Sequence, residues 1–332
     1  MKEYGGYLGL ELPFFKEYYE SSDKYNVISL NSGRSALMYI VKVKKIKEIW
    51  CPYYICESVI DALKKENVKI NFYYLSENLI PENLNEIKKE EFILWVNYFG
   101  MTPIEKIKER FKGYKNLIID NTQAFFSNPL EEAYNIYSCR KFFGVPDGGY
   151  LIGKNIEKIS LKQDESYNRA NFLLKSLEVG TNKAYEDSLK NEASFEKYEI
   201  LEMSKLTKRI LNSLDYEKIK LKRRHNFLKL HEKLKKYNKI DISNLDLETF
   251  PMVYPFLYDD DGMRKYLIKE KIYIPNWWKY ILKTVKENSL EYEYSTYLFP
   301  LPIDQRYEEK EMEDIVKIII TYIEGKNVEK IR

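Results

Sequence analysis

Four short segments of the sequence carry small, polar or ionisable residues at spacings that suit the binding of a charged ligand. The first segment, NSGRSAL (31–37), places Ser32, Gly33 and Arg34 at the start of a predicted helix. The first N–H groups of a helix have no partner within it, and beside a glycine they can converge on an anion. A Ser-Gly pair before a helix is also an ordinary helix cap, so the segment has two interpretations.

An acid and an amide stand at the ends of two apolar runs. In IIDNTQAF (118–125) the run ends at Asp120, where burial of a carboxylate is costly unless the group is paired. A buried acid there can hold a protonated heterocyclic nitrogen as an ion pair, or it can cap the following helix. In WVNYFG (95–100), Asn97 can supply a hydrogen bond at a strand end, and turn chemistry explains it equally well.

The fourth segment is SCRKFFGVPDGG (138–149). Ser138 ends an apolar run, and Lys141 follows three residues later with Arg140 beside it. Partial burial or a neighbouring positive charge lowers the pKa of a lysine and makes its amine reactive. The run Asp147-Gly148-Gly149 predicts a tight turn into the next strand. The alternative is a surface hairpin with a solvated lysine.

Strand-like and helix-like runs alternate in the first half of the chain and must position these segments. We expect strands at 27–30, 48–51, 69–75, 92–99, 116–120, 134–138 and 148–153, with helices at 31–46, 55–67 and 103–114. This alternation predicts an α/β fold with a mostly parallel sheet flanked by helices. Ligands of such sheets bind at the carboxyl ends of the strands, where all four segments fall.

The second half of the sequence is different in character. Residues 155–240 are rich in lysine and glutamate and include predicted helices at 198–214 and 216–237, and a last helix is predicted at 309–325. Proline and aromatic residues return between them, including Trp277 and Trp278, for which packing is favoured over a sugar-stacking wall. We expect a large domain at 1–212, with an N-terminal arm at 1–20, and a small α+β domain at 213–332.

Composition excludes several classes of function. The net charge of +3 is too small to favour nucleic acid or an anionic membrane. The cysteines and the two histidines lack metal-ligand spacing, so no metal site is expected. An odd and low cysteine count, no signal-peptide pattern and no run of 18 uncharged apolar residues indicate a soluble cytoplasmic protein.

A phosphate cradle, a strand-end acid and a reactive lysine, in this order, are the parts needed to hold pyridoxal 5'-phosphate. The sequence resembles the DegT/DnrJ/EryC1/StrS aminotransferase family of fold-type-I pyridoxal-phosphate enzymes over most of its length. The resemblance is most specific at DNTQA and SCRKFFGVPDGG, moderate at NSGRSAL, CPYYICESVIDAL and VNYFG, and weak in the C-terminal third. It implies a large domain with a mixed, mostly parallel sheet and a smaller α+β C-terminal domain.

The resemblance also assigns roles to single residues. Lys141 matches the lysine that forms a Schiff base with the cofactor, and Asp120 matches the acid that pairs with its ring nitrogen. Gln123 matches the glutamine near the phenolic oxygen. The implied cofactor-binding set is completed by Ser32, Gly33, Arg34, Cys56, Asn97 and Ser138. Cys56 stands where the family has a ring-stacking aromatic, so stacking is lost or is supplied by Tyr53 or Tyr54.

The activity that this resemblance implies is transfer of an amino group from an amino acid, often glutamate, to a keto-sugar linked to a nucleotide. The family also implies a homodimer whose neighbouring subunit touches the site through a segment that GTNKAYED (180–187) echoes only faintly. Two alternatives remain open. One is a different pyridoxal-phosphate reaction on a sugar, and the other is an inactive protein that keeps the fold as a binding or partner module.

Overall fold

The computed structural model describes residues 4–242 and 249–331 of the chain. Its main sheet contains seven strands in the spatial order β1-β7-β6-β5-β4-β2-β3. The strands are β1 (Asn26–Leu30), β2 (Glu48–Pro52), β3 (Lys69–Tyr73), β4 (Ile93–Val96), β5 (Leu117–Asp120), β6 (Tyr134–Ser138) and β7 (Gly149–Gly153). Strands β2 to β6 run parallel to one another. Strand β7 runs antiparallel to both of its neighbours, β6 and β1. The predicted α/β fold with a mostly parallel sheet is therefore confirmed.

The first half of the chain also contains the helices α1 (Gly33–Val43), α2 (Glu57–Lys65) and α3 (Ile104–Arg110). The Ser32 hydroxyl caps α1 by accepting a hydrogen bond from the Ser35 N–H at 3.0 Å. Every residue from Ser35 to Val41 is buried, so α1 is enclosed by the fold rather than half exposed. The start of α1 is thus held firmly at the end of β1.

The main sheet has an apolar layer on each face. Ile136 and Leu151 belong to the large cluster that also contains α1, whereas Tyr137 and Tyr150 pack into a second, aromatic cluster with Phe125. Neighbouring residues of a strand point to opposite faces, which explains this division. Burial on both faces is why the strands have few charged residues and could be predicted from apolar runs.

Residues 155–212 form α4 (Asn171–Val179), α5 (Thr181–Ala193) and α6 (Lys205–Leu211). The predicted helix at 198–214 is wrong in its first half. There the backbone pairs with the edge strand β1, since the Asn31 N–H donates to the Leu201 carbonyl at 3.0 Å and the Met203 N–H donates to the Ser29 carbonyl at 3.2 Å. An open strand edge offers unpaired backbone groups, and here they outweigh helical periodicity.

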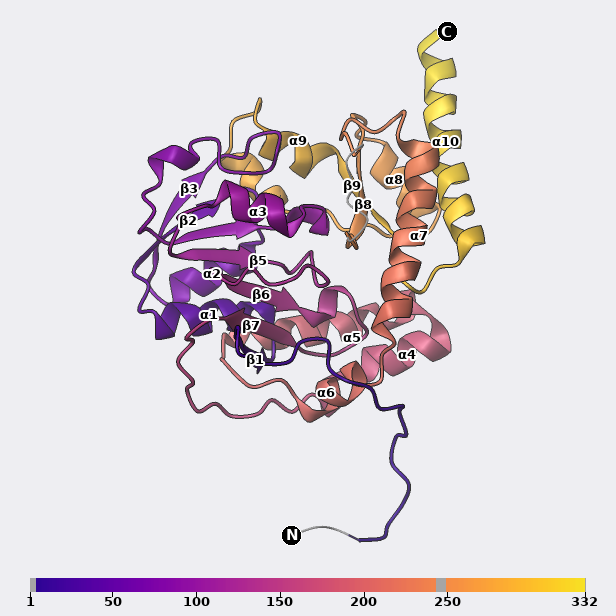
Figure 1. The fold of residues 1–332 in the computed structure, drawn as a ribbon. Helices are drawn as coiled ribbons and strands as arrows, with labels where there is room; N and C mark the ends of the chain where they lie inside the picture. The colour runs from indigo at the N-terminus through magenta and orange to yellow at the C-terminus, as the bar shows by residue number, and fades with distance from the viewer. Residues whose placement is uncertain (1–3, 243–248, 332) are drawn as a thin grey trace.

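The C-terminal part contains α7 (Tyr216–Leu234), β8 (Val253–Leu257), α8 (Met263–Lys269), α9 (Leu290–Tyr297), β9 (Leu298–Pro302) and α10 (Glu309–Ile331). Strands β8 and β9 form an antiparallel pair, and α7 and α10 lie side by side along one flank of the molecule (Figure 1). This part has its own core, which includes Phe227, Phe256 and Ile319. The boundary between 212 and 213 stays a prediction.

Short 3-10 helices complete the chain. They are η1 (Leu84–Glu86), η2 (Tyr98–Gly100), η3 (Cys139–Lys141), η4 (Tyr167–Arg169), η5 (Ser194–Lys197) and η6 (Lys279–Lys283). Three of them involve residues predicted for the site: η2 follows Asn97, η3 contains Lys141, and η5 contains Phe195, whose carbonyl accepts from Arg34. Their tight turns change the direction of the chain close to the ends of β4, β6 and α5.

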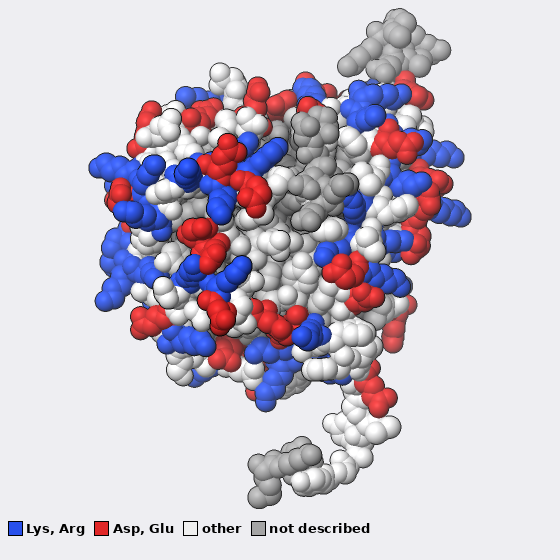
Figure 2. Space-filling model, in the orientation of Figure 1, with Lys and Arg blue, Asp and Glu red and all other residues white. Residues whose placement is uncertain are grey.

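The N-terminal arm extends away from the body of the molecule (Figure 1). On the face shown in Figure 2, basic and acidic side chains are mixed, and the middle of the face carries uncharged side chains. Within the described ranges, none of the helices combines the length and the apolar character that crossing a membrane requires.

Candidate active site

A cavity of about 200 Å³ opens at the carboxyl edge of the main sheet. The residues predicted for the site converge on it from four different places in the sequence. Eight of the nine line the cavity: Ser32, Gly33, Arg34, Cys56, Asp120, Gln123, Ser138 and Lys141. They follow β1, β2, β5 and β6, whose carboxyl ends lie at one edge because these strands are parallel.

Lys141 ends the 3-10 turn η3, directly after β6. Lys141 is exposed to solvent and lines the cavity. Partial loss of hydration among the lining residues lowers the pKa of Lys141 below its ordinary value, and the nearby Arg140 and Arg34 lower it further, while Cys56 and Asp120 oppose the shift. Lys141 therefore keeps access to solvent and differs from an ordinary surface lysine in its two cationic neighbours and in its place on the cavity wall.

Asp120 is the last residue of β5 and is almost fully buried. One carboxylate oxygen accepts a hydrogen bond from the Thr122 N–H at 2.9 Å. Burial raises the pKa of Asp120, and the Thr122 hydrogen bond and the charge of Lys141 partly offset the rise. A positively charged ring nitrogen beside Asp120 would favour its ionised form.

Gln123 and the loop after β4 are connected. The Gln123 side-chain oxygen accepts a hydrogen bond from the Phe99 N–H at 2.8 Å, and Gln123 also lines the cavity. Phe99 holds the left-handed backbone region, at a φ of 61°. This fixed orientation makes Gln123 a hydrogen-bond donor to a ligand.

One end of the cavity is strongly positive. Arg34 donates from Nη1 to the Phe195 carbonyl at 2.8 Å, and the guanidinium of Arg140 lies 4.3 Å from the centre of the Phe195 ring. Burial and the charge of Arg34 lower the pKa of Arg140 to about 10, while Glu192 forms an ion pair with it. Because the start of α1 lies at the same end, the group best suited to this place is an anion.

The paired glycines after Asp147 allow two backbones to approach closely. A Cβ atom on Gly149 would lie 2.5 Å from the Ser32 carbonyl carbon and 2.7 Å from the Gly33 nitrogen. The neighbouring Gly148 has a φ of 116°, and its N–H donates to the Asn31 carbonyl at 2.7 Å. The glycines therefore seat the start of α1 against the hairpin that carries Lys141.

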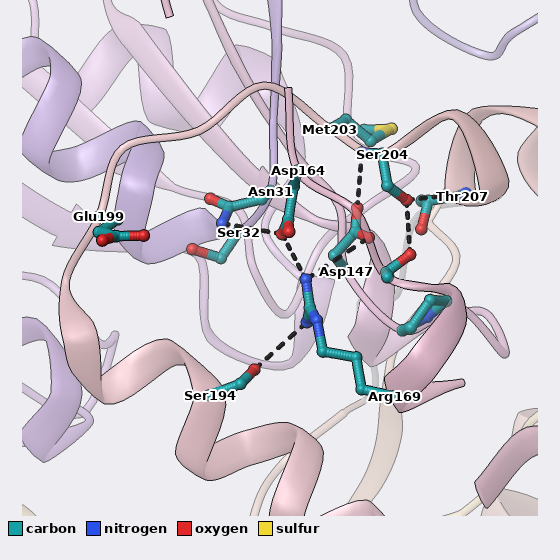
Figure 3. Close-up of polar contacts among 12 residues, drawn as sticks. Asn31, Ser32, Asp147, Asp164, Arg169, Ser194, Glu199, Met203, Ser204 and Thr207 are labelled. Carbon is teal, nitrogen blue, oxygen red and sulfur yellow. Dashed lines mark hydrogen bonds and ion pairs between the residues drawn. The ribbon is translucent and has the colours of Figure 1, made fainter. Parts of the chain in front are cut away.

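Asp147 anchors the same hairpin through a network of polar contacts (Figure 3). It is fully buried, accepts a hydrogen bond from the Ser204 N–H at 3.2 Å and lies 3.9 Å from Arg169. Arg169 also pairs with Asp164, which accepts a hydrogen bond from the Asn31 side chain at 3.1 Å. Burial raises the pKa of Asp147. The network joins the hairpin to the end of β1 and to the chain before α6.

Asn97 is not among the residues that line the cavity. It is fully buried, and its amide nitrogen donates to the Asn121 side chain at 3.0 Å. Tyr53 stacks on Phe72 and Tyr54 packs against Trp278, so neither tyrosine lines the cavity. Asn97 thus supports the strand-end loops through Asn121.

Several lining residues were missed by the sequence reasoning. Trp278 lines the cavity although packing was expected for the tryptophan pair, and it also packs on the main core while Trp277 stacks near Phe99. Glu192 of α5 and Phe195 of η5 line it as well. No local signal marks Glu192, because its helix has the composition of an ordinary surface helix.

A second cavity, of about 480 Å³, adjoins the first. Both cavities are lined by Lys141 and Arg140. The second also touches α4, α5 and the loop after β9, through Phe172, Leu173 and Gln305 among others. A molecule in this space would therefore lie next to the Lys141 amine.

Solved structures share this architecture. The sugar aminotransferase CalS13 from Micromonospora echinospora aligns with a TM-score of 0.58 at 12% identity, over 88% of this chain and 86% of its own. A DegT DnrJ EryC1 StrS aminotransferase from Brucella abortus gives 0.54 at 15% identity, over 90% and 86%. Spr1654 from Streptococcus pneumoniae, in its PLP form, gives 0.60 at 13% identity, over 88% and 85%. The sequence matches no family model and no curated protein.

The chain therefore has the fold of the type-I pyridoxal-phosphate transferases, and the predicted fold class is confirmed. Among the proteins that share this fold with it are sugar aminotransferases of the DegT/DnrJ/EryC1/StrS group, the group that the motifs resemble. Likeness at these identities establishes architecture, and the activity has to be argued from the site.

Proposed function

We propose that the protein is a pyridoxal-phosphate-dependent aminotransferase that moves an amino group from an amino acid to a keto-sugar. The observation that carries the proposal is that Asp120 and Lys141 line one cavity whose positive end adjoins the start of α1. A carboxylate, a lysine amine and an anion site in one pocket are the complement of this cofactor. The shared fold of sugar aminotransferases supports the class of substrate.

The residues present fit the cofactor in charge and in hydrogen bonding. Ser32, Gly33, Arg34 and Ser138 would hold the phosphate, with Arg140 as a further positive charge. Asp120 would pair with the ring nitrogen, and Gln123 would donate to the phenolic oxygen. Cys56 would face the ring in place of a stacking aromatic. We assign Asn97 no direct contact with the cofactor, because it does not line the cavity.

Lys141 is the residue that moves protons in this proposal. When bound, pyridoxal phosphate supplies an electron sink that stabilises negative charge on the carbon bearing the amino group. The lowered pKa of Lys141 favours its neutral amine, which can take a proton from that carbon and later return it. Asp120 holds the ring nitrogen in its protonated form. The second cavity gives the amino acid and the keto-sugar access to Lys141.

We further propose glutamate as the amino donor, a nucleotide-linked keto-sugar as the acceptor, and a homodimer as the working assembly. Exposed apolar side chains support the dimer. Tyr7, Leu8 and Phe14 of the arm are at least 74% exposed, and Leu177 of α4 is 84% exposed. Apolar surface of this extent favours a protein partner. In the proposed dimer, a second copy covers the arm and the α4–α5 face.

We place the reaction in the cytoplasm. The three cysteines, Cys51, Cys56 and Cys139, are unpaired, and two of them are buried. Free thiols are the usual state in a reducing compartment. Cys56 in particular would stay reduced there beside Lys141.

The decisive test is the absorption spectrum of the purified protein with pyridoxal phosphate, before and after borohydride, beside Lys141→Ala. We expect a visible band in the wild type that borohydride removes and that Lys141→Ala lacks. Amino acids are then screened as donors against keto-sugars. Full turnover by Lys141→Ala without added amine would refute the proposal, whereas cofactor binding without any turnover would favour a binding module.

A further inference from the structure

The loop after β9 lies on the turn that carries Lys141. The Gln305 side chain donates from Nε2 to the carbonyl of Phe142, the residue next to Lys141, at 2.8 Å. Arg223 of α7 donates from Nη2 to the same carbonyl at 3.2 Å. The two side chains are also joined to each other, because Arg223 Nε donates to Gln305 Oε1 at 3.0 Å. One backbone carbonyl thus has two donors from the C-terminal part of the chain.

Arg223 is built into this position. Only 2% of the residue is exposed, Nη1 donates to the Met252 carbonyl at 3.1 Å, and the guanidinium lies 4.5 Å from the centre of the Phe142 ring. A guanidinium is costly to bury unless its N–H groups have partners. Here the three partners are the Gln305 side chain and the carbonyls of Met252 and Phe142, and all of them lie outside α7. This is a fixed contact rather than a side chain resting on the surface.

The loop that carries Gln305 is fixed as well. The Asn226 amide on α7 donates to the carbonyls of Ile303, Asp304 and Tyr307, at 3.3, 3.2 and 3.1 Å. Since Asn226 and Arg223 lie on the same face of α7, one helix holds both halves of the contact. Gln305 and Arg223 also line the second cavity together with Lys141.

On the other side of the turn, the Phe142 N–H donates to the Cys139 carbonyl at 3.0 Å. The peptide groups on both sides of Phe142 are therefore held, one within η3 and one by Gln305 and Arg223. Because Lys141 precedes Phe142, its Cα–Cβ direction is set by the first of these peptides and stabilised by the second. Rotation of the Phe142 carbonyl away from its donors would change the path of the turn and the direction of the lysine.

We propose that Gln305 and Arg223 are positioning residues for Lys141: by holding the Phe142 carbonyl, they fix the turn from which the Lys141 amine enters the cavity. They act through the backbone and do not touch the reacting atoms. The proposal rests on the proposed function only in taking Lys141 as the reacting amine. It gives the C-terminal part of the chain a defined effect on the site in the N-terminal part.

The test uses Gln305→Met, which keeps the length of the side chain and removes both the donor to Phe142 and the acceptor of the Arg223 bond. The first readout needs no cofactor: acetylation of Lys141 by acetic anhydride, followed by mass spectrometry of its peptide from near-neutral to strongly alkaline pH. We expect Gln305→Met to move the midpoint of this profile toward that of an ordinary lysine. The second readout is turnover with cofactor, where kcat falls about tenfold to a hundredfold and KM for the amino donor changes much less.

Lys222→Met is the matched control, because Lys222 neighbours Arg223 on α7 but pairs with Glu308 at the surface. It is expected to leave both readouts unchanged. Gln305→Glu can still accept from Arg223 but cannot donate to Phe142. It is expected to shift the Lys141 profile and kcat in the same direction, and it serves as the test if Gln305→Met does not fold. An unchanged Lys141 profile in folded Gln305→Met and Gln305→Glu overturns the proposal. If the wild type binds no cofactor, the proposed function fails, but the acetylation profile still tests the positioning role of Gln305. The failure of one proposal can therefore be told from the failure of the other.

Discussion

Asp120 and Lys141 line the same cavity from the ends of β5 and β6, and each shifts the pKa of the other toward its charged form. For each group, this effect on the pKa is smaller than the opposite effect of lost hydration. The cofactor-free protein therefore holds an acid and an amine that are both biased toward neutrality. A bound positive ring nitrogen would favour ionised Asp120.

Asp120→Asn should separate binding from stability. The asparagine oxygen can keep the Thr122 hydrogen bond, but the side chain cannot pair with a protonated ring nitrogen, so we expect turnover to fall about a hundredfold or more. Without cofactor, the substitution is expected to be neutral or favourable for the stability of the fold. Because the folded-state pKa of Asp120 is raised, wild-type stability is lost as pH rises from its ordinary value through the folded value. At neutral pH the variant should thus be at least as stable in urea, and this advantage should disappear at acid pH.

Arg140→Gln should raise the pKa of Lys141. Arg140 is one of the two positive charges that lower it, so removing its charge allows the amine to hold its proton to higher pH. The rate at which Lys141 combines with pyridoxal phosphate should then reach its plateau at a higher pH than in the wild type. Lys190→Gln on α5, which removes a charge that is 77% exposed and pairs with Asp187, is the control and should leave the profile in place. A lower plateau pH in Arg140→Gln would contradict the assignment.

Gly149→Ala should destabilise the fold and distort the site together. The added Cβ atom meets the backbone of Ser32 and Gly33, which cannot move without shifting the start of α1. We expect a loss of about 1–3 kcal/mol in the free energy of unfolding, measured with urea, and weaker cofactor binding. Gly144→Ala is the matched control, because its Cβ would meet only the Leu173 side chain at an ordinary 3.6 Å. Equal stability of the two variants would show that the close contact is not rigid.

Leu177→Lys should weaken the proposed dimer. This side chain is 84% exposed on the apolar face of α4, and burying a lysine there against a second copy would be costly. Sedimentation at several protein concentrations should show a shift toward monomer. Leu221→Lys, at a residue 66% exposed on the different helix α7, should sediment like the wild type. A wild type that sediments as a monomer at every concentration would argue against the dimer itself.

The sequence located those site residues whose position depends only on where a strand ends. Asp120 could be placed at a strand end because three apolar residues precede the polar run and are buried on both faces. Ser138 and Lys141 followed in the same way from β6. Once the strands are parallel, topology brings these positions to one edge, and no side-chain detail is needed.

The remaining site residues depend on tertiary structure. Glu192 reaches the cavity because α5 lies over it, and Trp278 does so because the C-terminal part folds back onto the main core. Neither fact has a local signature in the sequence. The same limit explains the helix wrongly predicted at 198–203, since pairing with the distant β1 overrode local periodicity. Asn97 shows the converse, because a polar residue at a strand end can be directed toward neighbouring loops instead of the cavity.

The edge strand β1 gives the biosynthesis of this protein a definite order. Within the main sheet β1 pairs with β7, and that partner follows it by roughly 120 residues. At translation rates of roughly 5–20 residues per second, β1 leaves the ribosome about 6–25 s before β7 exists. During this interval its apolar residues are without their sheet, and the start of α1 has no hairpin to lie against. The pocket therefore cannot begin to form before β7 has been made, and its lining is complete only after Glu192, Phe195 and Trp278 have followed.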